Sequence, residues 1–94
     1  MKLGYAGFNA GPLATPESIA AVLKCAEEAG FESAWTGEHV VAIDPQEPPS
    51  PVPPDFPFID TVAALSFAAG VTRRLKLGSG IILLAQRNPV VLAK

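Results

Sequence analysis

The chain has 94 residues, of which 49% are hydrophobic and 17% charged, and this composition is typical of a folded chain with a hydrophobic interior. Its net charge of −2 and its scattered basic residues argue against nucleic-acid binding, and no apolar run approaches the roughly 20 residues that cross a bilayer. The single Cys25 excludes an internal disulfide and favours a reducing, cytoplasmic setting.

The first predicted elements are a strand and a helix. Residues 2–8 are short, apolar and interrupted by glycine, which predicts a strand that ends at the loop NAGP. Thr15 and Pro16 form an N-cap and a first-turn proline, and Gly30 is expected to close the helix that starts there. The buried stripe of this helix is predicted to consist of Ile19, Val22, Leu23, Ala26 and Ala29.

The middle of the chain is predicted to hold a second strand, a long loop and a second helix. The strand is FESAWT, residues 31–36, and its Trp35 is expected to lie in the core together with Phe8. Residues 40–57 are dense in proline, so we expect no regular element there. Asp60 is expected to cap a helix that stops at Gly70. Its predicted buried stripe is Val62, Leu65, Ser66 and Ala69.

The last part of the chain is predicted to hold a third strand and the start of a third helix. The near-continuous apolar run LKLGSGIILL, residues 75–84, suits a strand covered on both faces. Arg87 is interpreted as a charged loop residue ahead of an N-cap at Asn88 and a first-turn proline at Pro89.

Strands and helices therefore alternate along the chain, which predicts an α/β fold with parallel strands and right-handed crossovers. A doubly wound sheet and a (β/α)8 barrel both fit the alternation, and a barrel of about 250 residues would take its opening third from this chain. Because the chain ends inside a helix, we expect a fragment, or a module that is completed by association.

Glu38 and His39 follow directly after the second predicted strand. In parallel α/β folds the ligand binds beyond the carboxyl ends of the strands, so this pair is expected at the functional face. A histidine there can donate or accept a proton near neutral pH, and a neighbouring carboxylate can orient it. The alternative is a solvated loop histidine, and the sequence leaves both open.

The glycines that flank Ser79 are the second candidate feature. Glycine weakens a strand interior, so Gly78 and Gly80 indicate a bulge, a close ligand or tight packing, and spacing does not separate these explanations. No clustered ligands predict a metal site, GFNAG matches no nucleotide-binding loop, and no nucleophile elbow surrounds Ser79.

Several segments resemble the amino-terminal part of the bacterial-luciferase-like monooxygenase superfamily. They are the opening strand, AEEAGFESAWTGEHV and AALSFAAGVTRRLKLGSGIILLAQRNPVVLAK. The acid–histidine pair, the proline-rich loop and RNPVVLAK are similar, more narrowly, to its coenzyme F420 (deazaflavin) branch. The resemblance implies that residues 1–94 are the amino-terminal part of a TIM-barrel domain, with residues 40–57 as a loop within it.

The same resemblance implies roles for particular residues. His39 and Glu38 would be catalytic residues near the cofactor ring, and Ser79, Gly80 and Ile81 would bind that ring at a bulge with a non-prolyl cis peptide between Gly80 and Ile81. The implied reaction is hydride transfer between coenzyme F420 and a small-molecule substrate, with His39 as proton donor or acceptor.

Two further interpretations stand beside this one. The first is an FMN-dependent monooxygenase of the same superfamily. The second is a non-catalytic βα module that forms a homo-oligomer through its strand edges.

Overall fold

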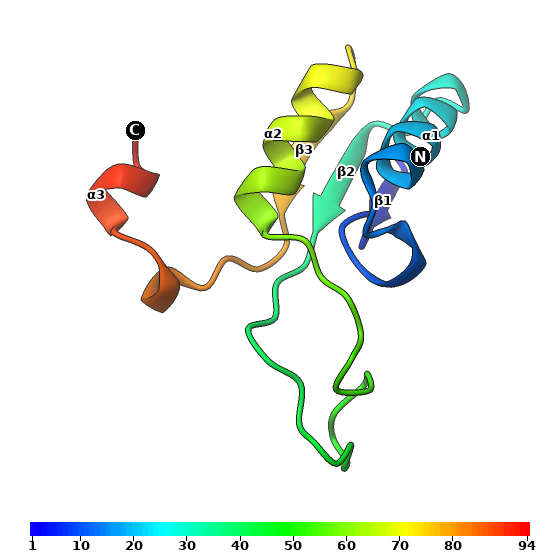
Figure 1. Ribbon diagram of the computed structural model, residues 1–94. Coiled ribbons are helices and arrows are strands. Elements are labelled where there is room, and N and C mark those ends of the chain that lie inside the picture. Colours follow the sequence, from blue (N-terminus) through cyan, green and yellow to red (C-terminus); the bar gives the residue numbers. More distant parts are fainter.

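A computed structural model describes residues 1–94 as an open sheet of three parallel strands with helices packed on one face (Figure 1). The strands lie in the order β1, β2, β3, and Trp35 of β2 is paired in register with Ala6 of β1 and Gly78 of β3. Strands and helices alternate as predicted. The elements are β1 (Gly4–Ala6), η1 (Gly11–Leu13), α1 (Pro16–Glu28), β2 (Ser33–Thr36), α2 (Thr61–Val71), β3 (Lys76–Ser79), η2 (Leu84–Gln86) and α3 (Pro89–Leu92).

All three predicted helix caps are present. The Thr15 hydroxyl accepts the Ser18 N–H at 3.1 Å, and the Asp60 carboxylate accepts the Ala63 N–H at 3.0 Å. The Asn88 side chain likewise accepts backbone N–H groups in the first turn of α3. These side chains satisfy backbone donors that have no partner inside the helix, which is why the starts of the helices can be predicted from local sequence.

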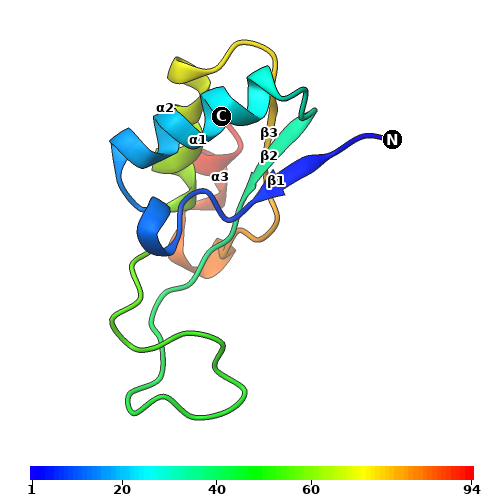
Figure 2. The same cartoon turned by 90° about the vertical axis from the view of Figure 1, so that its right-hand side faces the viewer.

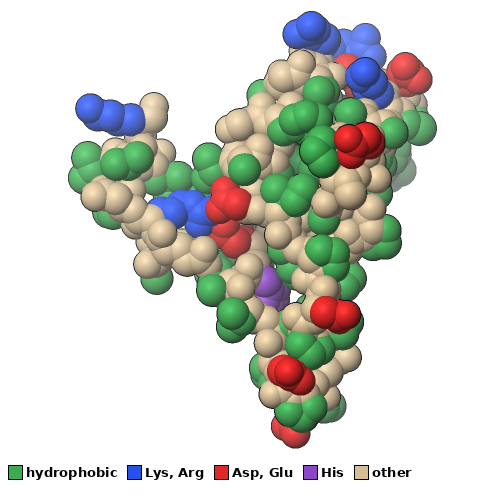
Figure 3. Space-filling view, in the orientation of Figure 1, with side chains coloured by type: hydrophobic (Ala, Val, Ile, Leu, Met, Phe, Trp, Pro, Cys, Tyr) green, Lys and Arg blue, Asp and Glu red, His purple; other side chains and the backbone are tan.

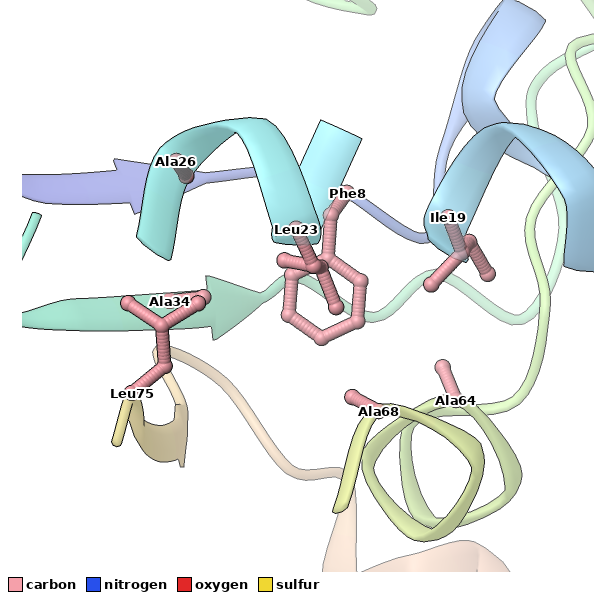
Figure 4. Close-up of a cluster of buried hydrophobic side chains, with 8 residues drawn as sticks. All are labelled: Phe8, Ile19, Leu23, Ala26, Ala34, Ala64, Ala68 and Leu75. Carbon is pink, nitrogen blue, oxygen red and sulfur yellow. The ribbon is translucent and has the colours of Figure 1, made fainter. Parts of the chain in front are cut away.

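The hydrophobic core lies between α1, α2 and one face of the sheet. Figure 2 shows both helices on the same side of the strands, and Figure 4 shows the side chains that meet between them. The buried cluster consists of Phe8, Ile19, Leu23, Ala26, Ala34, Ala64, Ala68 and Leu75. No helix combines the length and the apolar character that a membrane crossing requires.

Trp35 is not in this core, contrary to the prediction. Side chains alternate across a strand, and Ala34 and Thr36 face the helices, so Trp35 lies on the uncovered face and is 43% exposed. Its indole packs over two glycines of the neighbouring strands: a Cβ on Gly78 would come within 2.6 Å of the ring, and one on Gly4 within 3.2 Å. Tight packing therefore accounts for Gly78.

Helix α2 buries a different face from the predicted one. Its buried residues are Thr61, Ala64 and Ala68, whereas Val62, Ser66 and Ala69 are exposed and Leu65 is only partly buried. A helix that is apolar almost all round has no preferred face of its own, and the Thr61 hydroxyl settles the orientation by hydrogen bonding to Thr36 Oγ1 at 3.1 Å. The helix also continues through Gly70 to Val71.

The other element boundaries differ in detail. Ala29, expected in the stripe of α1, is exposed, while Gly30 follows the helix with a φ of 84° and ends it as predicted. β3 is shorter than predicted, because the chain leaves the sheet after Gly80, whose N–H donates to the Thr36 carbonyl at 2.8 Å. Helices cover one face of β3 and not both faces as predicted (Figure 2). Residues 40–57 contain no helix or strand, as expected.

A carboxylate on α1 secures the turn that leads into β3. Glu27 Oε1 accepts the backbone N–H groups of Arg73 at 2.9 Å, Leu75 at 3.0 Å and Arg74 between them. These hydrogen bonds, that of Arg74 first, hold the pKa of Glu27 below its ordinary value.

Candidate functional site

The candidate site lies where the strands end and the long loop begins. β2 ends at Thr36 and continues directly into Gly37, Glu38 and His39, while β3 ends beside it at Ser79, which is paired in register with Thr36. Residues 40–57 extend beyond this edge of the sheet (Figure 1). The acid–histidine pair is therefore at the carboxyl ends of the strands, where the sequence predicted it.

Two buried polar side chains hold the backbone just before this pair. Asn9, which is fully buried, donates to the Gly37 carbonyl at 2.8 Å and to the Ile59 carbonyl at 2.9 Å, and its Oδ1 accepts the Gly37 N–H at 3.1 Å. Thr61 Oγ1 lies 3.0 Å from the same Gly37 carbonyl. The position of Gly37 is thus set by the segment after β1 and by the start of α2 together.

Neither Asn9 nor Thr61 was among the predicted site residues. The one sequence signal for Asn9 is its place directly after the first predicted strand, at the end of the sheet where ligands bind in this fold class. Thr61 follows the predicted cap Asp60 and had no signal of its own.

Glu38 forms an ion pair with Arg87, which corrects the interpretation of Arg87 as a simple loop residue. Arg87 Nη2 lies 2.5 Å from Glu38 Oε1 and Nη1 lies 3.1 Å from Oε2, a two-pronged contact. The same guanidinium also pairs with Asp60, the cap of α2. The side chains of Arg87 and Glu38 are only 12% and 5% exposed, so this ion pair is largely shielded from water.

Glu38 is held by the backbone as well. The Leu83 N–H donates to Glu38 Oε2 at 2.5 Å. Burial by itself would raise the pKa of Glu38, but this hydrogen bond and the guanidinium of Arg87 outweigh burial and keep that pKa below its ordinary value. Glu38 is therefore a fixed carboxylate that ties the loop after β2 to the segment between β3 and α3.

His39 follows Glu38 in the chain but is exposed, whereas Glu38 is buried. No hydrogen bond joins the two side chains, and the imidazole packs near the Phe58 ring with a centroid separation of 5.5 Å. It lines a cavity of about 190 Å³ with Glu38, Asp60 and Gln86, and a second of about 140 Å³ with apolar residues that include Val40 and Phe56. Figure 3 shows the histidine of this chain, in purple, in a hollow beside the cluster of charged side chains.

Ser79, Gly80 and Ile81, the predicted cofactor-binding residues, lie beside Gly37 at the same edge. The Gly80 N–H donates to the Thr36 carbonyl. The backbone N–H of Ile81 and the Ser79 hydroxyl have no hydrogen-bond partner in the chain. A Cβ on Gly80 would come within 3.3 Å of the Thr36 carbonyl. The Ile81 N–H and the Ser79 hydroxyl are therefore available to bind a ligand.

The peptide bond between Gly80 and Ile81 is trans, which corrects the expected non-prolyl cis bond. Such a bond costs about 3–4 kcal/mol and persists only where surrounding structure enforces it. Ile81 is 55% exposed, so the chain encloses this segment too little to do so.

The arrangement combines a histidine at a cavity, a buried ion pair behind it and a glycine-containing edge with free hydrogen-bonding groups. A comparison with protein families matches the whole of residues 2–94 to the luciferase-like monooxygenase model. The chain belongs to this family. Luciferase-like monooxygenases are flavin-type oxidoreductases that use FMN or F420, and the parallel βα arrangement is consistent with part of the family's TIM barrel. Neither the curated proteins nor the solved structures gave a significant match.

Proposed function

We propose that this luciferase-like protein is an oxidoreductase that transfers a hydride between a small organic substrate and coenzyme F420, with His39 moving the accompanying proton. The observation that carries the proposal is the place of His39, at the carboxyl end of β2, exposed to a cavity and attached to a backbone that Asn9 and Thr61 hold in position. We further propose that residues 1–94 form the amino-terminal part of a TIM-barrel domain.

We propose that the deazaflavin ring binds at the edge of the sheet where β3 ends. The Ser79 hydroxyl and the Ile81 N–H, which have no partner in the chain, would hydrogen bond to the rim of the ring. When bound, this cofactor exchanges a hydride with a carbon of the substrate. The preference for F420 over FMN rests on the resemblance of Glu38–His39 and RNPVVLAK to the deazaflavin branch.

We propose that the cavities beside His39 take the substrate, because they are too small for the cofactor ring. At about 140, 190 and 270 Å³ they are smaller than the roughly 300–1,000 Å³ of pockets that enclose drug-sized ligands. Val40, Phe56 and Phe58 would cover the carbon skeleton and exclude water.

The proton step follows from the position of His39. In the oxidation of a CH–OH group, the bound cofactor would supply the hydride acceptor. The His39 imidazole would accept the hydroxyl proton as the C=O bond forms, and in the reverse direction it would return that proton to the oxygen. Glu38, whose carboxylate is engaged by Arg87 and Leu83, serves to hold the segment that carries His39.

The cofactor assignment is tested by fluorescence titration of the natural gene product that contains these residues, once with F420 and once with FMN. Binding of F420 is the expected result. Tight binding of FMN without binding of F420 would overturn the deazaflavin assignment and leave the FMN-dependent monooxygenase.

The role of His39 is tested with His39→Ala, assayed for F420 reduction against a panel of small alcohols. We expect turnover to fall by about 10²–10⁴-fold, the usual contribution of a general acid or base, with little change in cofactor affinity. Lys24→Gln, on the exposed face of α1, is the control. Turnover that survives His39→Ala would make the histidine an ordinary loop residue.

A second candidate function, a self-associating module without catalysis, is favoured by the sheet itself. β1 and β3 each pair with one strand only, and the face that carries Trp35 has no helix over it. Sedimentation at increasing concentration tests this candidate: a homo-oligomer with no affinity for either cofactor supports it, and a monomer that binds F420 rejects it.

A further inference from the structure

Arg87 pairs with both carboxylates of the cavity that His39 lines. That cavity is bounded by Glu38, His39, Val40, Phe58, Ile59, Asp60 and Gln86. Its two acids, Glu38 and Asp60, come from different elements, and one guanidinium contacts both of them. No other basic side chain forms an ion pair with either acid.

The other two cavities that His39 lines contain no charged side chain. They are formed by residues 40–43, 49–51, 54, 56 and 58, and none of these is acidic or basic. Glu38 and Asp60 are therefore the only charged side chains that line a cavity together with His39, and both are engaged by Arg87.

We infer that Arg87 is a positioning residue of this site: by pairing with Glu38 and Asp60 together, it leaves the His39 imidazole without an ion-pair partner and so free to accept a proton from the substrate. This inference rests on the function proposed above. A histidine clamped as a cation by a carboxylate has no free lone pair, so it cannot act as a base until that ion pair is broken.

The geometry explains why this task falls to an arginine. Its planar guanidinium can contact two carboxylates at once through separate N–H groups. A lysine at this position would offer one compact ammonium and could pair fully with only one of the two acids.

The test is a pH titration of the His39 imidazole signals by NMR in the natural gene product, with His39→Gln used to assign them. In Arg87→Met we expect the midpoint to rise by about 1 pH unit relative to the wild type, because two carboxylates without an ion-pair partner then share the cavity with the imidazole. In Arg87→Met with Glu38→Gln the midpoint should return most of the way to the wild-type value. Equal midpoints in all three proteins would overturn the inference.

Two measurements keep the outcome clear. Circular dichroism reports whether Arg87→Met is folded, and if it is not, Arg87→Lys should give a smaller upward shift, with no shift counting against the inference. The NMR result does not depend on turnover. If Arg87→Met shows no shift of the midpoint while His39→Ala is inactive, only the role of Arg87 is rejected. If His39→Ala is active, the proposed function itself is rejected.

Discussion

Replacement of Asn9 by alanine should destabilise the protein strongly, because the Asn9 side chain is buried and makes three hydrogen bonds to backbone groups. The Gly37 carbonyl keeps its contact with Thr61, so two groups lose their partner: the Gly37 N–H and the Ile59 carbonyl. A buried polar group without a partner costs about 1–3 kcal/mol, which gives about 2–6 kcal/mol in total. That is a large part of the 5–15 kcal/mol that is usual for a whole protein.

The assay is urea unfolding of the natural gene product, compared with Asn88→Ala as a matched control. Asn88 is also a side-chain cap for backbone N–H groups but is exposed, and its loss should cost about 1 kcal/mol. Asn9→Asp keeps the acceptor for the Gly37 N–H but turns a carboxylate oxygen toward two carbonyls, so it should destabilise at least as much as alanine. If Asn9→Ala is no worse than Asn88→Ala, the buried network does not hold Gly37 as we argue.

Three further outcomes are expected in the same unfolding assay. Gly78→Ala should destabilise by about 1–3 kcal/mol because its Cβ meets the Trp35 ring, whereas Gly70→Ala, with open space around it in a helix, should stabilise by about 0.5–1 kcal/mol; equal effects would contradict the packing of the indole. Leu23→Ala, fully buried on α1, should cost about 2–5 kcal/mol, and a loss under 1 kcal/mol would show that this position is not core. Because the folded pKa of Glu27 is lowered, its stabilising effect is present above the ordinary value of 4.5 and is lost as the pH falls through the folded pKa, so the wild type should exceed Glu27→Gln in stability near neutral pH and converge with it in acid. A difference that does not change with pH would contradict this account.

The features that were predicted well depend on residues close in sequence. Thr15, Asp60 and Asn88 bond to backbone groups within three residues, so each cap can be recognised from its own neighbourhood. The alternation of elements is equally local, and it placed Glu38 and His39 at the carboxyl edge of the sheet.

The features that were missed depend on distant partners. Arg87 meets Glu38 across 49 residues and Asn9 meets Gly37 across 28, and no local pattern announces either contact. Trp35 was predicted on the wrong face of the sheet. The strand Ser33–Thr36 is too short to show which of its two alternating sets of side chains faces the helices. Only the packing of Ala34 beneath α1 and α2 decides it.

Asn9 joins the two ends of the proline-rich loop, since Gly37 and Ile59 stand before and after residues 40–57. These hydrogen bonds hold the two ends of the loop together and involve no residue of the loop itself. Closure entropy rises only with the logarithm of length, so doubling such a loop costs about 0.6 kcal/mol. Related proteins could therefore exchange this segment for longer or shorter ones, and so reshape the wall of the cavity for other molecules, while the histidine stays where the sheet holds it.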